Sequence, residues 1–218
     1  MIIIDYPPGG LGNFVAQVIT DTLKDSEHSS FHRILYPIYD IKLVQKSKEL
    51  FQSLAKDWKP KHSVAVVHSY GDLQTLNDLK KKFNAKIFTI RPFDNWPQLF
   101  LNCEEKATAD NKENKNRNWS SNEYYNHFQN LKTNWGYSAI DEILNFDNFY
   151  KDELIFCQTL KNLNPSADFQ KIYKIFQKTQ MPLIDKLQQI IQASKSKQNF
   201  KNLSALDQAL IRVCQELY

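Results

Sequence analysis

Glycine is scarce in this sequence. Only five occur among 218 residues, and three of them, Gly9, Gly10 and Gly12, fall within four positions. Glycine is needed where the backbone must adopt positive φ or where another group approaches it closely. A loop that holds most of the chain's glycines therefore has a specific structural or binding requirement.

Cysteine is also rare, with three residues that are far apart and form no CxxC pair: Cys103, Cys157 and Cys214. Four of the five histidines show no spacing typical of metal ligands: His28, His32, His62 and His127. This pattern indicates neither a disulfide framework nor a zinc site or other metal site. Reduced thiols of this kind are typical of a cytoplasmic protein.

Long apolar runs and a strong charge of one sign are missing as well. No segment approaches the roughly 18 apolar residues of a membrane helix, and the N-terminus has no signal-peptide pattern. The net charge is +4 and the sequence pI is about 8.8. This mildly basic balance suits an anionic ligand but falls short of a nucleic-acid-binding signature. We therefore expect a cytoplasmic protein that binds neither membrane nor nucleic acid.

Strand and helix patterns alternate in the first half of the chain. Apolar, β-branched strands are expected at residues 2–6, 63–69 and 86–91. Amphipathic helices are expected at residues 13–24, 41–54, 73–84 and 96–107. Residues 121–131 and 139–144 have a partly helical pattern, and residues 143–149 contain a short fourth strand. The alternation predicts an α/β protein with a parallel sheet flanked by helices.

The last third of the chain is predicted to be helical, with breaks at Pro165 and Pro182. The four helices expected there are residues 150–163, 167–179, 182–194 and 204–217. We interpret residues 1–218 as one domain. It comprises a nucleotide-binding core at 1–105, a mobile loop or lid at 109–120 and a helical part at 150–218 that packs on the core.

The glycine-rich loop predicts an anion site. A strand that ends in such a turn and opens a helix gathers backbone N–H groups where the helix dipole is positive. The candidate binding residues are Pro8, Gly9, Gly10, Leu11, Gly12, Asn13 and Phe14. A Walker A loop is excluded because Asn13 and Phe14 stand where that motif has lysine and a hydroxyl residue. The dinucleotide fingerprint is incomplete, since Val15 occupies its third glycine position.

Three segments, taken in order, resemble the sulfotransferase family that uses 3′-phosphoadenosine 5′-phosphosulfate. They are DYPPGGLGNF, VVHS and KIFTIRPFDNW, at the ends of the first three predicted strands. The family has Tyr-Pro before the 5′-phosphosulfate loop, a histidine after a later strand and an Arg-Asn-Pro-x-Asp-like motif after the next. The matching residues are Tyr6-Pro7, His68 and Arg91-Pro92-Phe93-Asp94. The resemblance covers residues 1–105, and residues 143–153 are similar to a later strand-to-helix segment of the family.

This resemblance implies a P-loop-like three-layer α/β/α fold that binds 3′-phosphoadenosine 5′-phosphosulfate (PAPS) without a metal. His68 would be the general base for a hydroxyl or amine of a small-molecule or glycan acceptor. The loop N–H groups would hold the 5′-phosphate, and Arg91 the 3′-phosphate. The loop carries no lysine, and Leu99 stands where the family has serine. Two alternatives stay open: a catalytically inactive nucleotide- or anion-binding module of the same fold, and a nucleotide-sugar glycosyltransferase suggested by GGLGN.

Overall fold

The computed structural model describes residues 1–20, 29–31, 41–61, 63–69, 71–110, 118–135, 140–195 and 203–217. The strands in these residues are β1 (Ile2–Asp5), β2 (Ser29–Phe31), β3 (Val64–Val67), β4 (Lys86–Arg91) and β5 (Glu142–Asn145). They form one sheet in the order β2-β3-β1-β4-β5, and every pair is parallel. The predicted α/β class with a parallel sheet flanked by helices is confirmed.

The centre of the sheet is buried on both faces. Ile3 of β1 lies between Ala65 of β3 and Ile87 of β4, and all three side chains are fully buried. Such short runs of isoleucine and valine are typical of parallel strands, because helices cover both sides of the sheet. Residues on alternate sides of β1 therefore belong to different hydrophobic clusters, Ile4 to one and Ile3 to the other.

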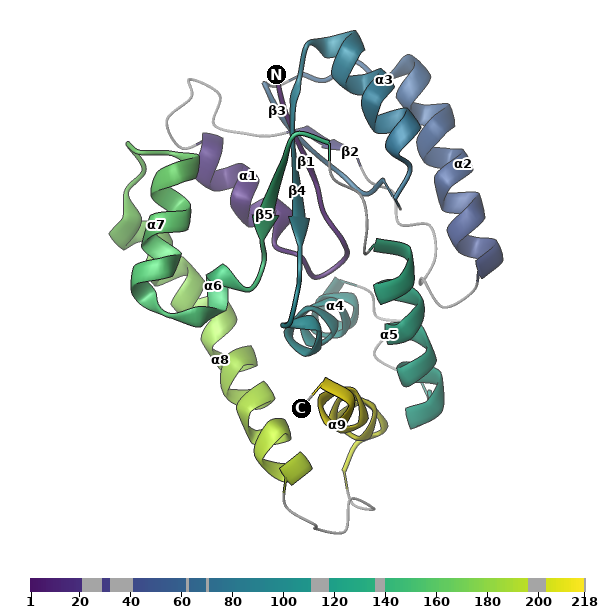
Figure 1. Ribbon diagram of the computed structural model, residues 1–218, viewed down its shortest axis with the longest axis vertical. Coiled ribbons are helices and arrows are strands. Elements are labelled where there is room, and N and C mark those ends of the chain that lie inside the picture. Colours follow the sequence, from purple (N-terminus) through teal and green to yellow (C-terminus); the bar gives the residue numbers. More distant parts are fainter. Residues whose placement is uncertain are drawn as a thin grey trace.

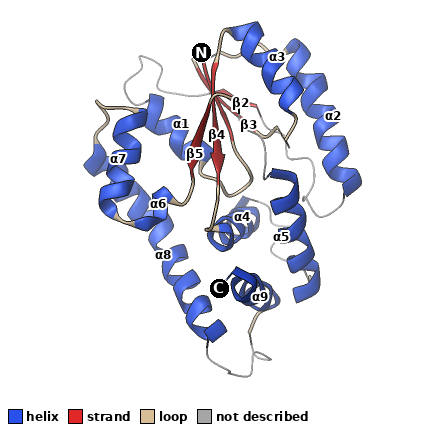
Figure 2. Cartoon of the chain, viewed as in Figure 1, coloured by secondary structure: helices blue, strands red, loops and turns tan. Residues whose placement is uncertain are grey.

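Helices surround the sheet on both faces (Figures 1 and 2). They are α1 (Gly12–Thr20), α2 (Ile41–Asp57), α3 (Leu73–Phe83), α4 (Trp96–Asp110), α5 (Ser121–Trp135), α6 (Asn148–Lys151), α7 (Glu153–Leu163), α8 (Phe169–Lys195) and α9 (Ala205–Leu217). Helices α2 and α3 lie on one side of the sheet, and α1 and α7 lie on the other (Figure 1). Helices α4, α5 and α9 gather beyond the ends toward which the arrows of β4 and β5 point (Figure 1).

The C-terminal helices share a hydrophobic cluster with the sheet. Phe156 of α7, Phe176 of α8 and Leu210 of α9 belong to the cluster that also contains Ile4 and Phe128. Each of these side chains is at most 4% exposed. The last third of the chain therefore packs directly against the α/β part.

Some expectations for individual elements are wrong. Helix α8 continues through Pro182 instead of breaking there. Buried Phe176 and Leu187 anchor the helix on either side of this exposed proline, so tertiary packing outweighs the lost backbone hydrogen bond. The partly helical pattern at 139–144 is also wrong, because β5 begins at Glu142 and pairs with β4. Strand β2 was not predicted.

Some predicted segments fall partly outside the described residues. Of the predicted lid at 109–120, α4 extends through Asp110, and residues 111–117 lie outside the described part of the chain. Residues 21–24 of the first predicted helix also lie outside the described part of the chain.

The start of α3 is held by Asp72, whose carboxylate accepts hydrogen bonds from the backbone and hydroxyl of Thr75 and from the side chain of Gln52. Burial raises the pKa of Asp72, but these hydrogen bonds together outweigh burial and hold the pKa below its usual value of 3.8. Because the folded pKa is the lower one, the stabilisation is complete above the unfolded pKa and disappears as pH falls through the folded pKa.

We expect Asp72→Ala to reduce the free energy of unfolding by about 1 kcal/mol near pH 7, as for other N-cap residues. The difference from the wild type should shrink as the pH falls below 3.8, because the stabilisation by the ionised carboxylate is progressively lost there. Urea unfolding near pH 7 and at a series of pH values below 3.8 measures this. Asp78→Ala is the matched control, since Asp78 is an exposed residue of the same helix that accepts only a surface bond from Gln74. An equal loss at all these pH values would contradict the capping role.

Candidate functional site

The carboxyl ends of β1 and β3 form the switch point of the sheet. These strands are neighbours, but the chain after β1 enters α1 on one side, and the chain after β3 enters α3 on the other (Figure 1). In open α/β sheets, ligands bind outside the carboxyl ends of the strands, at the point where the connections from two neighbouring strands leave on opposite sides of the sheet. The residues at this edge are polar, namely Asp5, Tyr6, His68 and Ser69, and all four are buried.

A buried carboxylate joins the two strand ends. Asp5, which is fully buried, accepts hydrogen bonds from the backbone N–H of Ser69 at 2.9 Å and from its hydroxyl at 2.8 Å. The Ser69 hydroxyl oxygen in turn accepts the N–H of Gly71. These two hydrogen bonds hold the carboxyl ends of β1 and β3 together.

His68 is anchored to Tyr6, which shortly precedes the glycine-rich loop. Its side chain is only 4% exposed, its Nδ1 lies 2.6 Å from the carbonyl oxygen of Tyr6, and the two rings are 4.3 Å apart. A carbonyl oxygen can only accept, so Nδ1 carries the proton. The lone pair of the neutral imidazole is then on Nε2, the atom from which a general base would act.

The glycine-rich loop is tightly packed. Gly9 has φ of 81°, Leu11 has φ of 62°, and the N–H of Gly10 donates to the carbonyl of Pro7 at 2.8 Å. A Cβ atom on Gly9 would lie 2.3 Å from the carbonyl oxygen of Leu99 on α4. A Cβ atom on Gly12 would lie 2.1 Å from the ring of Tyr6. These glycines are therefore required by close contacts within the protein itself.

The other predicted loop residues have different environments. Pro8 is buried and Asn13 is half-buried. The Phe14 ring packs against three aromatic rings of the main hydrophobic cluster, those of Phe149, Phe156 and Phe176. The side chain of Phe14 is thus part of the core, and only its backbone could serve a ligand.

Arg91 is the last residue of β4, two positions beyond Thr89, which pairs with Asp5 of β1. Its guanidinium lies 5.1 Å from the ring centre of Phe93. The glycine-rich loop, His68 and Arg91 thus lie at the carboxyl ends of three adjacent strands, β1, β3 and β4, at one edge of the sheet.

The segment after Arg91 is shaped by a residue that the sequence pattern did not identify. Asp147 accepts hydrogen bonds from three consecutive backbone N–H groups, those of Phe93, Asp94 and Asn95. Its side chain is 5% exposed. This carboxylate therefore fixes the turn between β4 and α4.

Asn102 is a second unpredicted residue beside the loop. Its side-chain N–H groups donate to the Gly9 carbonyl at 3.2 Å and to the Tyr150 hydroxyl at 2.8 Å. The Tyr150 hydroxyl donates onward to Gln180 at 3.0 Å, and burial raises the pKa of Tyr150 well above its usual range. A chain of hydrogen bonds therefore joins the loop to α4, α6 and α8.

A further polar cluster lies between α4 and α5. It consists of Cys103, Glu104 and His127, whose potential ligand atoms lie within 4.8 Å of one another. Glu104 Oε1 is 3.1 Å from His127 Nε2, and both side chains are 3% exposed. No spacing pattern in the sequence identifies this cluster, because its residues come from two helices separated by a polar stretch.

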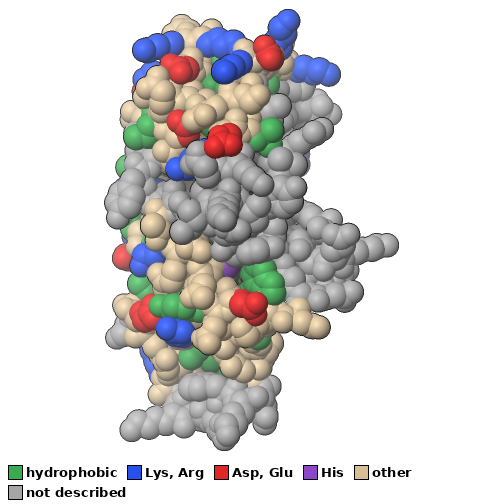
Figure 3. Space-filling model, turned by 90° about the vertical axis from the view of Figure 1, so that its right-hand side faces the viewer, with side chains coloured by type: hydrophobic (Ala, Val, Ile, Leu, Met, Phe, Trp, Pro, Cys, Tyr) green, Lys and Arg blue, Asp and Glu red, His purple; other side chains and the backbone are tan. Residues whose placement is uncertain are grey.

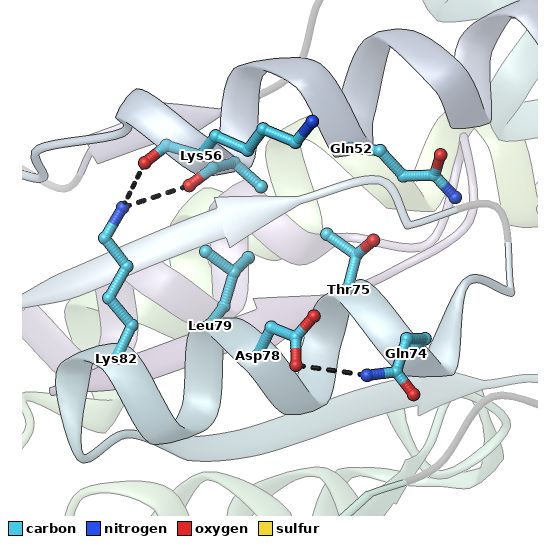
Figure 4. Close-up of a pocket in the computed structure, with 8 residues that line it drawn as sticks. Gln52, Lys56, Gln74, Thr75, Asp78, Leu79 and Lys82 are labelled. Atoms are coloured by element: carbon cyan, nitrogen blue, oxygen red, sulfur yellow. Dashed lines mark hydrogen bonds between the residues drawn. The ribbon is translucent and has the colours of Figure 1, made fainter.

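A groove of about 500 Å³ lies elsewhere, between α2 and α3 (Figure 4). Its lining residues all belong to these helices: Gln52, Ala55, Lys56, Gln74, Thr75, Asp78, Leu79 and Lys82. The Lys82 ammonium points across the groove and donates to the backbone carbonyls of Ala55 and Lys56 (Figure 4). This lysine closes the C-terminal turn of α2, which is a structural role.

Charges of both signs are mixed on the face that Figure 3 shows. Lysine and arginine side chains gather at its upper end, with acidic side chains beside them (Figure 3). In the lysine run at the end of α3, Lys80 forms an ion pair with Asp141. Part of this basic charge is thus compensated within the protein.

Comparison of the chain with protein families, with curated proteins and with solved structures gives no match. Among the described residues, no helix has the length and apolar character required to cross a membrane.

Proposed function

We propose that this protein binds PAPS at the carboxyl ends of β1, β3 and β4 and transfers its sulfuryl group to a hydroxyl or amine acceptor. The observation that carries the proposal is that the glycine-rich loop, His68 and Arg91 lie at the carboxyl ends of three adjacent parallel strands at one edge of the sheet. These are the three segments that resemble P-loop-like sulfotransferases. The edge is also the one at which open α/β sheets bind ligands.

In the proposed reaction the backbone N–H groups at the start of α1 hold the 5′-phosphate, where the helix dipole favours negative charge. Arg91 binds the 3′-phosphate by charge-assisted hydrogen bonds. His68 removes the proton from the acceptor through Nε2 as the sulfur–oxygen bond forms and the bond to the nucleotide phosphate breaks. The hydrogen bond from Nδ1 to the Tyr6 carbonyl supports this role, because it selects the tautomer with the basic lone pair on Nε2.

The second candidate is an anion-binding module of the same fold without catalysis. Two observations favour it: His68 is 4% exposed, and the loop has no lysine to stabilise charge on a departing phosphate. If this candidate is correct, the loop and Arg91 still bind the nucleotide, but the protein transfers no sulfuryl group.

Thermal unfolding with 3′,5′-adenosine bisphosphate tests the nucleotide site. A ligand at a hundredfold excess over its dissociation constant stabilises the native state by about 2.7 kcal/mol. For a chain of this size we expect the unfolding midpoint to rise by roughly 5 to 10 °C. Arg91→Ala should abolish most of the rise. Arg212→Ala, a matched control on the exposed side of α9, should retain it.

The remaining outcomes separate the candidates. No midpoint shift in the wild type would overturn the PAPS proposal, and protection by a nucleoside diphosphate sugar alone would favour a glycosyltransferase. If the bisphosphate protects, His68→Asn distinguishes enzyme from module, because the asparagine amide can still donate to Tyr6. If His68→Asn loses sulfuryl transfer but keeps the midpoint shift, His68 is supported as the general base. If the wild type itself transfers no sulfuryl group, the binding module is supported.

A further inference from the structure

The cluster of Cys103, Glu104 and His127 combines three different metal-ligating groups between two packed helices. We propose that it is a binding site for a transition-metal ion of the Zn²⁺ type. This inference does not depend on the proposed nucleotide site. It differs from the sequence expectation, which indicated no metal because the cysteines showed no paired histidine.

Helix geometry explains how the three side chains converge. Residues four apart lie on the same side of a helix, so Leu99 and Cys103 form one row on α4, and Phe100 and Glu104 form the next. The first row faces the glycine-rich loop, where a Cβ on Gly9 would touch Cys103. The second row faces α5, because Glu104 contacts His127. Cys103 therefore lies between the loop and the α5 interface.

Aromatic packing fixes the two helices beside the cluster. The rings of Phe100 and Phe128 are stacked, with centres 4.5 Å apart and planes 6° from parallel. Phe128 follows His127 directly, and Phe100 lies one turn before Glu104. The ring of Trp119 lies 5.7 Å from that of His127. The metal-ligating groups are therefore held in position by rigid neighbours, which is a requirement for a preformed site.

The distances suit a tetrahedral ion. Zinc bonds of 2.0 to 2.2 Å to nitrogen and oxygen place the two ligand atoms about 3.4 Å apart. Glu104 Oε1 and His127 Nε2 are 3.1 Å apart, and the cysteine sulfur lies within 4.8 Å of them. A closure on the order of 1 Å by the thiol would complete three bonds.

The chemistry of the donors selects the class of metal. Thiolate and imidazole ligands favour Zn²⁺ and its neighbours over Mg²⁺ or Ca²⁺, which prefer oxygen ligands alone. Three protein ligands leave the fourth tetrahedral position for water or another ligand. Cys103 is half-buried whereas Glu104 and His127 are buried, so an ion would enter from the Cys103 side.

The test uses the full-length protein, freed of metal with a chelator and titrated with Co²⁺ and Zn²⁺. We expect one equivalent of Co²⁺ to give a thiolate-to-cobalt charge-transfer band and intense tetrahedral visible bands, both removed by Zn²⁺. Cys103→Ser should abolish the charge-transfer band and weaken binding at least about tenfold. Cys157→Ser, which alters another half-buried cysteine, should change neither.

His127→Gln should also weaken binding at least about tenfold, but it alters a buried contact, so circular dichroism must show that it folds. Cys103→Ser keeps the test decisive if His127→Gln does not fold, because it exchanges one atom at a half-buried position. A wild-type protein without stoichiometric binding would overturn the proposal and leave Glu104 and His127 as a buried pair in close contact. The proposal is also overturned if the cobalt spectrum of Cys103→Ser equals that of the wild type.

Discussion

Gly9→Ala is expected to lower the free energy of unfolding by about 2 to 5 kcal/mol, through two additive causes. Gly9 has φ of 81°, and a residue with a side chain pays about 1 to 2 kcal/mol for a left-handed conformation. The new Cβ would also lie 2.3 Å from the Leu99 carbonyl oxygen and 2.8 Å from the Cys103 backbone nitrogen. Both obstacles are backbone atoms of α4, so no rotamer change can remove them.

Gly12→Ala provides the comparison for this result, because its Cβ would meet the Tyr6 ring and not backbone. Chemical unfolding of both variants should be measured with and without Tyr6→Leu. The smaller leucine side chain should recover part of the stability lost in Gly12→Ala and none of that lost in Gly9→Ala. A Gly9→Ala protein within about 1 kcal/mol of the wild type would contradict the packing of the loop against α4.

The glycine loop shows what a sequence pattern leaves open. Three glycines between a buried strand and a helix predict a tight turn at the helix N-terminus, and the turn is present. The same pattern cannot distinguish a glycine needed for ligand approach from one needed for approach of another helix. The contact between Gly9 and α4 joins segments about 90 residues apart in the chain, and only the folded structure contains it.

Strong local periodicity explains which elements were predicted correctly. Strands β1, β3 and β4 are continuous β-branched runs, and α2 and α3 have regular amphipathic spacing. The strand ends that carry the loop, His68 and Arg91 could therefore be placed at one edge from the parallel topology alone. Strand β2 has three residues, too few for a period-two pattern, and its place is set by pairing with β3.

The residues that support the site could not be found in this way. Asn102, Asp147 and the cluster of Cys103, Glu104 and His127 act through partners that are distant in sequence. An isolated asparagine or aspartate in the sequence is indistinguishable from a solvated one. Burial and hydrogen bonding, which give these residues their roles, are properties of the tertiary structure.

Asp147→Ala should destabilise the protein by about 3 kcal/mol, because it removes a buried carboxylate that accepts three backbone N–H groups. These N–H groups belong to the turn that follows Arg91, and without the carboxylate they lose their partner in a partly buried setting. Hydrogen bonds to charged groups contribute about 1.5 to 3 kcal/mol each, and bonds to one acceptor are not additive.

Chemical unfolding of two companion variants separates this role from ordinary helix capping. Asp147→Asn keeps one acceptor oxygen and should lose less stability than Asp147→Ala. Asp152→Ala removes an exposed carboxylate that accepts a single N–H, that of Ile155 at the start of α7, and should cost about 1 kcal/mol. If Asp147→Ala costs no more than Asp152→Ala, the turn after β4 is held by other contacts. If it costs about three times as much, Asp147 positions the segment that begins with Arg91, and its variants should also weaken any ligand that Arg91 binds.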